Sequence, residues 1–376
     1  MKESKDFDIV FLYSGNPLPA MLDMAYYAHN SGLKVGTIIL ERGRGDLILD
    51  SSLVNYELKV INVNYKSVSL SRFMSVPLMY AKLNSYIKNN LKSGGIVIPG
   101  SYDLLVYTYL IKLTSNFFIY YQVRDLHALQ FGKGILPSII RRFEKLMLKK
   151  VDKILVSSPG FIDHYFKKIY NGNIVLIENI PSREVWENFK ITKSNLFTIR
   201  IGFIGIIRYK ESLFQLIEAV EELNIQGYSF EVFFAGGGDT SDLKQKIKQK
   251  EKFIFQGAYE YAKDIIELYN KIDLIYSVYD GNDFNCKVAM PNKFYESIIT
   301  KKPILVASNT FLASKVEEFG IGANVISGDK CILVEKLKQI NQDNSWFKNA
   351  QSNLLKLESE DLFKSYEISL KEAIFY

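Results

Sequence analysis

Short runs of β-branched and aromatic residues alternate with longer segments of helical period along the chain. In the first half these runs predict strands at 8–13, 34–40, 58–63, 95–99, 117–123, 153–157 and 174–177. A second series predicts strands at 198–204, 230–235, 253–256, 274–278, 303–307 and 323–326, with helices at 213–223, 242–249, 263–271, 293–300 and 311–319. Such alternation is typical of parallel sheets with helices on both faces. We therefore predict an α/β protein with two tandem doubly wound, Rossmann-like domains.

The division into domains follows from length and from one irregular segment. A chain of 376 residues exceeds the size that one hydrophobic core usually serves. The segment 181–196 is polar, lacks periodicity and contains Pro181, which is typical of an interdomain linker. We predict domains at 1–185 and 186–350. The helical pattern at 351–376 is expected to cross back and brace the first domain.

Composition excludes several classes of protein. Hydrophobic residues make up 48% and charged residues 23%, as in ordinary folded domains. The two cysteines, Cys286 and Cys331, form no CxxC pair, so neither a disulfide framework nor a zinc site is expected. The charged N-terminus and the absence of an apolar run of about 18 residues argue against a signal peptide or a spanning helix. We expect a cytoplasmic protein.

Positive charge is concentrated in the first half of the chain. Residues 1–180 hold 22 Lys and Arg against 14 Asp and Glu, a net charge of +8, whereas the remainder carries −2. The predicted helix 136–150 combines an apolar stripe with a basic one. The apolar stripe comprises Ile139, Ile140, Phe143, Leu146 and Leu148, and the basic stripe comprises Arg141, Arg142, Lys145, Lys149 and Lys150. This asymmetry favours an anionic membrane surface or a phosphate-bearing acceptor as partner. We expect no nucleic-acid partner. An ordinary solvated surface is the alternative.

The loops after the strands of the second domain are where a ligand is expected, because doubly wound sheets bind ligands at the carboxyl ends of their strands. Gly205 follows the first of these strands, with Arg208 and Lys210 close behind. A glycine lets the backbone approach a phosphate, and an arginine fork can hold a diphosphate with two hydrogen bonds. A plain structural turn is the alternative.

Two further loops offer backbone groups. Gly236 and Gly237 belong to a glycine run after the second strand, where amides can face an anion at a helix start. The run matches neither GxGxxG nor a Walker loop, so no standard dinucleotide or ATP site is predicted. Ala258 and Tyr259 follow the third strand, where backbone groups can pair with a nucleobase edge. A simple turn remains the alternative for both loops.

The segment 290–297 carries the strongest local signal. Pro291 and Asn292 begin a predicted helix, and Glu296 falls on its first turns. A carboxylate there can accept hydrogen bonds from both vicinal ribose hydroxyls. Lys293 lies one turn earlier, where the positive end of the helix dipole also favours phosphate. The alternative is an exposed Lys–Glu pair on an amphipathic helix.

Taken together and in this order, these segments resemble glycosyltransferases of the GT-B fold, particularly the retaining family four with its many bacterial polysaccharide and lipopolysaccharide enzymes. The matching stretches are 143–154, 157–161, Asn179, 201–205 with Arg208, 216–219, 291–296 and 302–304. The resemblance covers nearly the whole chain. It implies sugar transfer from a nucleotide-diphosphate donor, UDP or GDP, to a glycan or lipid-linked glycan acceptor in bacterial surface polysaccharide synthesis.

The resemblance also assigns roles in the second domain. It implies that Arg208 and a nearby lysine neutralise the donor diphosphate, and that Glu296 is the second glutamate of the Glu-x7-Glu motif. Val288 stands where that motif has its first glutamate, which positions the donor sugar. A catalytically silent nucleotide-sugar-binding subunit and a GT-B nucleotide-sugar epimerase therefore stay open as alternatives. Glu296→Gln is expected to weaken nucleotide binding and to leave folding intact.

In the first domain the resemblance points to the loops after two strands. Asp125 and His127 follow the strand 117–123 and are expected to hold a sugar or acceptor hydroxyl. Gly15 and Asn16 follow the first strand and are candidate contacts for the acceptor or the diphosphate. A structural, hydrogen-bonded histidine is the alternative for His127.

The implied reaction is substitution at the anomeric carbon with retention, in which the leaving diphosphate accepts the acceptor proton. The protein then contributes positioning and charge stabilisation. Asp280 and Asp283 form the nearest acidic pair, and they do not make a DxD motif. We expect no obligatory metal or other cofactor.

Overall fold

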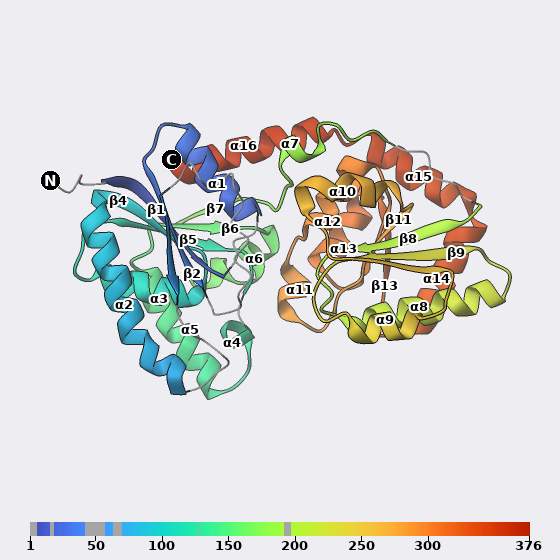
Figure 1. The fold of residues 1–376 in the computed structure, drawn as a ribbon, viewed down its shortest axis with the longest axis horizontal. Helices are drawn as coiled ribbons and strands as arrows, with labels where there is room; N and C mark the ends of the chain where they lie inside the picture. Colours follow the sequence, from blue (N-terminus) through green and yellow to red (C-terminus); the bar gives the residue numbers. More distant parts are fainter. Residues whose placement is uncertain (1–5, 16–18, 42–56, 63–69, 127, 192–196) are drawn as a thin grey trace. The chain divides into compact units, whose positions relative to one another are not determined.

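The computed structural model describes residues 6–15, 19–41, 57–62, 70–126, 128–191 and 197–376. The chain forms two compact units, one made of Met1–Glu178 with Tyr366–Tyr376 and the other of Asn179–Ser365. Each unit is a parallel sheet with helices on both faces (Figure 1). The prediction of two doubly wound, Rossmann-like domains is confirmed.

The first unit contains a seven-stranded sheet of order β3-β2-β1-β4-β5-β6-β7. Its strands are β1 (Phe7–Ser14), β2 (Val35–Glu41), β3 (Glu57–Asn62), β4 (Leu91–Pro99), β5 (Phe118–Val123), β6 (Lys153–Val156) and β7 (Asn173–Leu176). Its helices are α1 (Pro19–Asn30), α2 (Leu70–Asn90), α3 (Tyr102–Lys112), α4 (Ala128–Phe131), α5 (Ile135–Leu148), α6 (Pro159–His164) and the 3-10 turn η2 (Phe166–Lys168).

The second unit contains a six-stranded sheet of order β10-β9-β8-β11-β12-β13. Its strands are β8 (Ile199–Ile204), β9 (Phe230–Ala235), β10 (Phe253–Gly257), β11 (Leu274–Ser277), β12 (Ile304–Ala307) and β13 (Gly322–Val325). Its helices are α7 (Arg183–Trp186), α8 (Lys210–Ile225), α9 (Ser241–Ile247), α10 (Tyr261–Asn270), α11 (Phe284–Val288), α12 (Asn292–Thr300), α13 (Phe311–Phe319), α14 (Lys330–Gln342) and α15 (Asn344–Leu355), and α16 (Ser359–Phe375) runs from this unit into the first.

The apolar runs form strands because both faces of each sheet are covered. Every residue of β11 and β12 is buried, so these strands read as continuous apolar runs without alternation. Each predicted strand is present, and β9 and α13 have the predicted bounds. The carboxyl ends of the strands lie at one edge of each sheet because the strands are parallel, and in both units the strand order reverses at the first strand.

The division between the units falls at Glu178 and Asn179, before the predicted linker 181–196. Ile180 and Trp186 are buried, and the Trp186 ring packs edge-on against Tyr269 at a centroid distance of 5.5 Å. This packing ties the first part of the predicted linker to the second unit.

The end of α16 belongs to the first unit. The Lys153 ammonium donates hydrogen bonds to the carbonyls of Glu372 and Ala373, at 3.0 and 2.9 Å. The Tyr366 hydroxyl donates to Asp23 at 3.2 Å. These contacts hold the C-terminal residues against α1 and β6.

Helix α5 turns its apolar stripe outward. Its buried residues are Glu144, Met147 and Leu148, whereas Ile139 is 59% and Leu146 is 47% exposed. Ile135 and Leu136 at its first turn are exposed as well. The predicted stripe therefore does not face the core, except at Leu148 and in part at Ile140. Among the described residues, no helix is both long and apolar enough to cross a bilayer.

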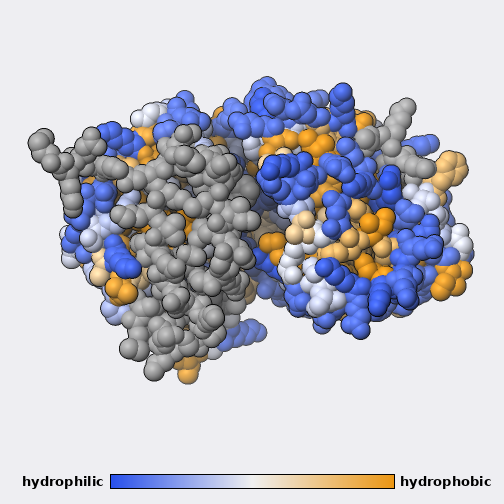
Figure 2. Space-filling view, viewed as in Figure 1, coloured by the Kyte–Doolittle hydropathy of each residue, from blue (hydrophilic) through white to orange (hydrophobic). Residues whose placement is uncertain are grey.

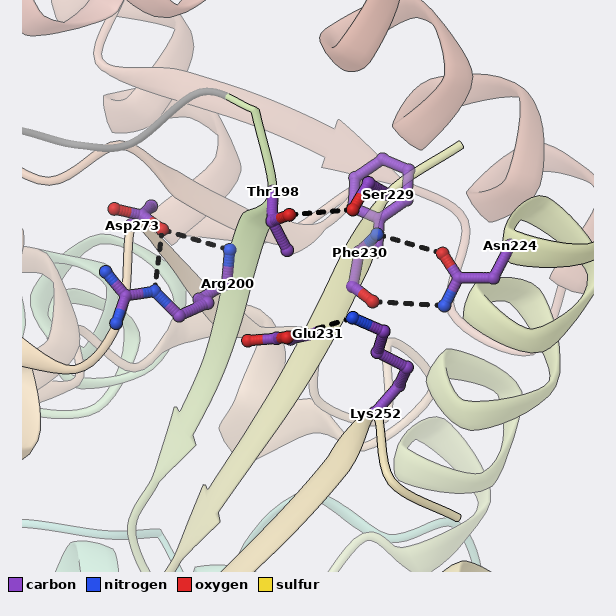
Figure 3. A network of polar contacts seen from close by, with 8 residues as sticks. All are labelled: Thr198, Arg200, Asn224, Ser229, Phe230, Glu231, Lys252 and Asp273. Carbon is purple, nitrogen blue, oxygen red and sulfur yellow. Dashed lines mark hydrogen bonds and ion pairs between the residues drawn. The ribbon is translucent and has the colours of Figure 1, made fainter. Parts of the chain in front are cut away.

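A polar network lies at the amino edge of the second sheet (Figure 3). The buried Asp273 carboxylate accepts hydrogen bonds from the backbone N–H and the Nε of Arg200, at 3.0 and 3.3 Å. The Asn224 side chain clamps the N–H and the carbonyl of Phe230, at 2.9 and 3.0 Å. Because these contacts join strand starts to neighbouring elements, the network fixes the sheet at the edge away from the expected ligand.

The second unit also carries a groove on its sheet face. Hydrophobic surface lies over β8 and β9 and is ringed by hydrophilic side chains (Figure 2). A groove of about 370 Å³ there is lined by Phe233, Ile254 and charged residues that include Arg200, Glu231 and Lys271. Glu231 pairs with Lys252 and Arg200 pairs with Asp273, so much of its charge is already compensated.

Candidate functional site

The loops after β8, β9 and β10 form one hydrogen-bonded floor at the carboxyl edge of the second sheet. Gly205 N–H donates to the Ala235 carbonyl at 2.9 Å, and Gly236 N–H donates to the Gly257 carbonyl at 2.7 Å. Ile207 forms an isolated parallel bridge with Gly238. The predicted loops that contain Gly205, Gly236 and Ala258 therefore lie side by side. The Gly236 amide is already bonded within the protein, which favours the structural interpretation of this glycine.

Close packing of these loops requires glycine. A Cβ placed on Gly236 would lie 1.8 Å from the Gly205 carbonyl oxygen, and one on Gly238 would lie 2.9 Å from the Ile207 carbonyl oxygen. Any side chain at Gly236 would force the two loops apart. The nearest atom to a Cβ on Gly205 would be Cε of Lys293, at 3.9 Å, so α12 reaches the same floor.

Helix α12 delivers a buried ion pair to this floor. Pro291 is its N-cap and Asn292 its first residue, and every residue from Lys293 to Thr300 is buried. The Lys293 ammonium donates to Oε2 of Glu296 at 2.7 Å. Asn179 Nδ2 donates to the Met290 carbonyl at 3.0 Å and so anchors the entry to the helix. The alternative of an exposed Lys–Glu pair is wrong.

Two tyrosines of α10 complete the surroundings of Glu296. Tyr269 Oη donates to Oε2 at 2.5 Å, and Tyr261 Oη donates to Oε1 at 2.8 Å. With Lys293, the carboxylate receives three hydrogen bonds while it is fully buried. The sequence analysis missed both tyrosines, although their spacing of eight residues on an amphipathic helix places them on one face.

The electrostatics of this cluster favour a charged Lys293 and neutral phenols. Burial is the largest single influence and lowers the pKa of Lys293, but the charge and hydrogen bond of Glu296, together with Tyr259 and Tyr279, hold this pKa above the ordinary value. Burial, followed by the charge of Glu296, raises the pKa of Tyr261 and of Tyr269 well above the usual range. Both phenols therefore stay protonated and act as hydrogen-bond donors.

The two other predicted cations of the second unit differ in their surroundings. Arg208 is exposed on the loop after β8, and it forms no ion pair with any other residue that the structure describes. Lys210 donates to Asp239 at 2.5 Å and to Asp242 at 2.7 Å, and it begins α8. Its charge is compensated within the protein, so Arg208 is the better placed of the two to meet an anion.

The remaining candidate residues of the second unit lie after β10 and on α11. Ala258 is exposed after β10, and Tyr259 is partly buried, which raises its pKa. Asp283 caps α11 by accepting from Cys286 N–H at 2.9 Å, which accounts for one member of the acidic pair. Burial raises the pKa of the Cys286 thiol to about 11, so it is no thiolate nucleophile. Val288 is buried at the end of α11.

Two predicted residues of the first unit, Gly15 and Asp125, lie at the carboxyl edge of its own sheet. Gly15 follows β1 with φ +77°, and its N–H donates to the Leu40 carbonyl at 2.9 Å. Asp125 is exposed two residues after β5. Asn16 and His127 lie outside the described residues.

Comparison with known proteins places this architecture. No family model matches the chain. A curated relative, the succinoglycan biosynthesis protein ExoL of Rhizobium meliloti, is 24% identical over 191 residues, which are 47% of this chain and 46% of that protein. The chain thus matches less than half the length of this relative.

Solved structures match the chain over nearly its whole length. A glycosyltransferase from Rickettsia africae has a TM-score of 0.70 at 20% identity, covering 98% of this chain and 99% of that one. HepE from Anabaena, in complex with UDP and glucose, has a TM-score of 0.69 at 15% identity, covering 97% and 99%. A putative UDP-N-acetylglucosamine 2-epimerase from Listeria monocytogenes has a TM-score of 0.64 at 12% identity, covering 97% and 96%. The chain has the GT-B fold that these proteins share.

Proposed function

We propose that the protein is a glycosyltransferase that moves a sugar from a nucleoside-diphosphate donor to a glycan or lipid-linked glycan acceptor. One observation carries the proposal, the buried Lys293–Glu296 pair at the carboxyl edge of the second sheet, next to Gly205. A buried ion pair at a ligand-binding edge is costly to maintain for stability alone. The solved structures with UDP and the curated polysaccharide biosynthesis protein support the same class.

In this proposal the second unit holds the donor. Glu296 accepts hydrogen bonds from the ribose hydroxyls, and Arg208 with Lys293 stabilises the diphosphate as it leaves. Lys293 can contact Glu296 and the diphosphate at the same time, because its ammonium has three protons and donates one of them to Glu296. The leaving diphosphate accepts the acceptor proton, and the reaction proceeds with retention and without an obligatory metal. UDP or GDP is the nucleotide.

The first unit is proposed to receive the acceptor in the synthesis of a bacterial surface polysaccharide. Asp125 and Gly15 lie at the carboxyl edge of its sheet, with Asn16 and His127 adjacent in sequence. A carboxylate at that edge can hold an acceptor or sugar hydroxyl.

We further propose that α5 attaches the protein to the anionic inner face of the cell membrane. Its outward apolar residues, among them Ile135, Leu136 and Ile139, can enter the lipid interface. The cations Arg142 and Lys145 on the same helix are exposed and can meet anionic headgroups. Such a surface suits an enzyme whose acceptor is carried on a lipid.

Vesicle sedimentation tests the membrane proposal. Binding to phosphatidylglycerol vesicles should weaken with salt, with Arg142→Gln plus Lys145→Gln, and with Ile139→Asp. The matched control is Ile225→Asp, because Ile225 is 87% exposed at the end of a helix of the second unit. If the protein stays in the supernatant at low salt, or if both aspartate variants behave alike, α5 is not the attachment surface.

A nucleotide panel followed by a transfer assay tests the function. A ligand at about 100 times its dissociation constant stabilises the folded state by roughly 2.7 kcal/mol, so thermal shifts with UDP, GDP and their sugars identify the donor. Incubation of that donor with cell lipid should then yield a glycolipid whose anomeric configuration matches the donor. Binding without turnover would instead support the alternative of a silent nucleotide-sugar-binding subunit, to which Val288 points. Interconversion of the nucleotide sugar would support an epimerase.

A further inference from the structure

The three hydrogen bonds to Glu296 are unevenly shared between its two oxygens. Oε2 accepts from Tyr269 and from Lys293, whereas Oε1 accepts from Tyr261. Each carboxylate oxygen has two lone pairs that can accept in the carboxylate plane. Oε2 is therefore filled, and Oε1 has one acceptor position left. A ligand with two adjacent hydroxyls needs two positions.

Of the three hydrogen-bond donors to Glu296, Tyr261 is the one that can move away from the carboxylate. Lys293 and Tyr269 are buried along with Glu296, whereas Tyr261, the first residue of α10, is half-buried as a residue, with its hydroxyl end buried next to the Trp186 side chain. A residue at the end of a helix can change its side-chain rotamer without disturbing an interior turn. Lys293 cannot leave at similar cost, because its departure would separate a buried ion pair.

We propose that Tyr261 is a stand-in for one ribose hydroxyl. Its phenol occupies one of the two positions on Oε1 while the site is empty, and a nucleoside diphosphate displaces it by presenting two vicinal hydroxyls. This inference rests on the proposed function, in which Glu296 binds ribose.

The Tyr261–Glu296 hydrogen bond stabilises the empty site and weakens nucleotide binding. A buried carboxylate with too few donors costs free energy, and Tyr261 removes that cost from the empty site. The ribose then gains two hydrogen bonds to Oε1 but breaks one. Tyr261 thereby lowers affinity for the ribonucleotide, which eases release of the nucleoside diphosphate after transfer. It also reduces discrimination against 2′-deoxyribose, because a single hydroxyl fits the position that is already open.

Calorimetric titration of Tyr261→Phe tests the proposal. The ligands are whichever of UDP and GDP the wild type binds, and its 2′-deoxy counterpart. The variant should bind the ribonucleotide about two- to tenfold more tightly, the value of one net hydrogen bond, because no phenol has to be displaced. Its affinity for the deoxynucleotide should stay unchanged. The wild type should accordingly distinguish the two ligands by less than the variant does.

Tyr269→Phe is the matched control. It removes a donor from the same carboxylate and the same helix, but from Oε2, for which the ribose does not compete in this scheme. It should not tighten binding of the ribonucleotide. A second check within the wild type needs no variant, because its ribonucleotide should bind at most about threefold more tightly than the deoxynucleotide when one bond gained offsets one lost.

The other outcomes separate this inference from the proposed function. Weaker binding of both ligands by Tyr261→Phe would make Tyr261 a fixed positioning residue, and an equal change or no change for both would also overturn the displacement. Wild-type discrimination of a hundredfold would do the same. Failure of the wild type to bind any nucleoside diphosphate would overturn the proposed function itself.

Discussion

Replacing Glu296 by glutamine tests how much the buried cluster stabilises the second unit. The substitution keeps the shape of the side chain and removes its charge. Glutamine has one carbonyl oxygen and one NH₂ group, so it cannot accept from Tyr261, Tyr269 and Lys293 in the present arrangement. The Lys293 ammonium, 8% exposed as a residue, is left without a counter-charge. From the structure we therefore expect Glu296→Gln to lower the stability of the second unit, in place of the expectation from sequence that folding stays intact.

The magnitude follows from the burial. Removing one partner of a buried ion pair costs about 3 to 5 kcal/mol, because the other charge remains desolvated. The amide oxygen can still accept from Lys293, which places the loss near the lower end, about 3 kcal/mol. Total unfolding free energies are about 5 to 15 kcal/mol, so this loss is readily measured.

Urea denaturation followed by tryptophan fluorescence is the assay. Both tryptophans, Trp186 and Trp346, belong to the second unit, so the signal reports that unit. The control is Glu267→Gln on α10, which breaks an exposed i,i+4 pair with Lys271 and should cost at most about 0.5 kcal/mol. Equal stability of the two variants would show that Glu296 does not compensate a buried charge.

Three further outcomes are expected. Gly236→Ala should destabilise the second unit by at least about 2 kcal/mol, because its Cβ would lie 1.8 Å from a carbonyl oxygen. Gly237→Ala is the control and should change the stability by at most about 0.5 kcal/mol, because its Cβ would lie 3.7 Å from the nearest atom. Equal urea midpoints of the two variants would refute the steric argument. Burial raises the pKa of Glu144 to about 7 from 4.5, against the opposing hydrogen bonds from Tyr165 and Gln130, so the folded state holds its proton more tightly and loses stability as pH rises through this window. Glu144→Gln should remove this loss of roughly 3 kcal/mol, and circular dichroism melts in which wild type and variant respond alike to pH 5 and pH 8 would contradict it. Sugar transfer should continue in the presence of EDTA. If EDTA abolishes transfer and added magnesium or manganese restores it, a metal is required.

Local pattern was enough for the architecture. The apolar runs at 230–235 and 303–307 predict strands because a sheet covered on both faces needs no polar alternation. Strand ends then indicate where a ligand is expected, and Gly205, Arg208 and Glu296 are predicted on that basis. The strand predictions are confirmed because they depend on residues that are close in sequence, whereas the roles of the site residues stay predictions.

Burial was decided by contacts between distant residues. The spacing of Lys293 and Glu296 is the same in an exposed pair and in a buried one, and packing against α10 makes it buried. The apolar stripe of α5 looks like a core face in sequence, yet the unit buries Glu144 and leaves Ile139 exposed.

The sequence by itself therefore determined the order of helices and strands, the two sheets and the edge of each at which a ligand is expected, because hydrophobic period and turn residues act locally. The tertiary structure decided that Tyr261 and Tyr269 donate to Glu296 and that the Gly236 loop presses on Gly205. Those facts depend on which surfaces meet when distant elements pack, and no local spacing encodes that.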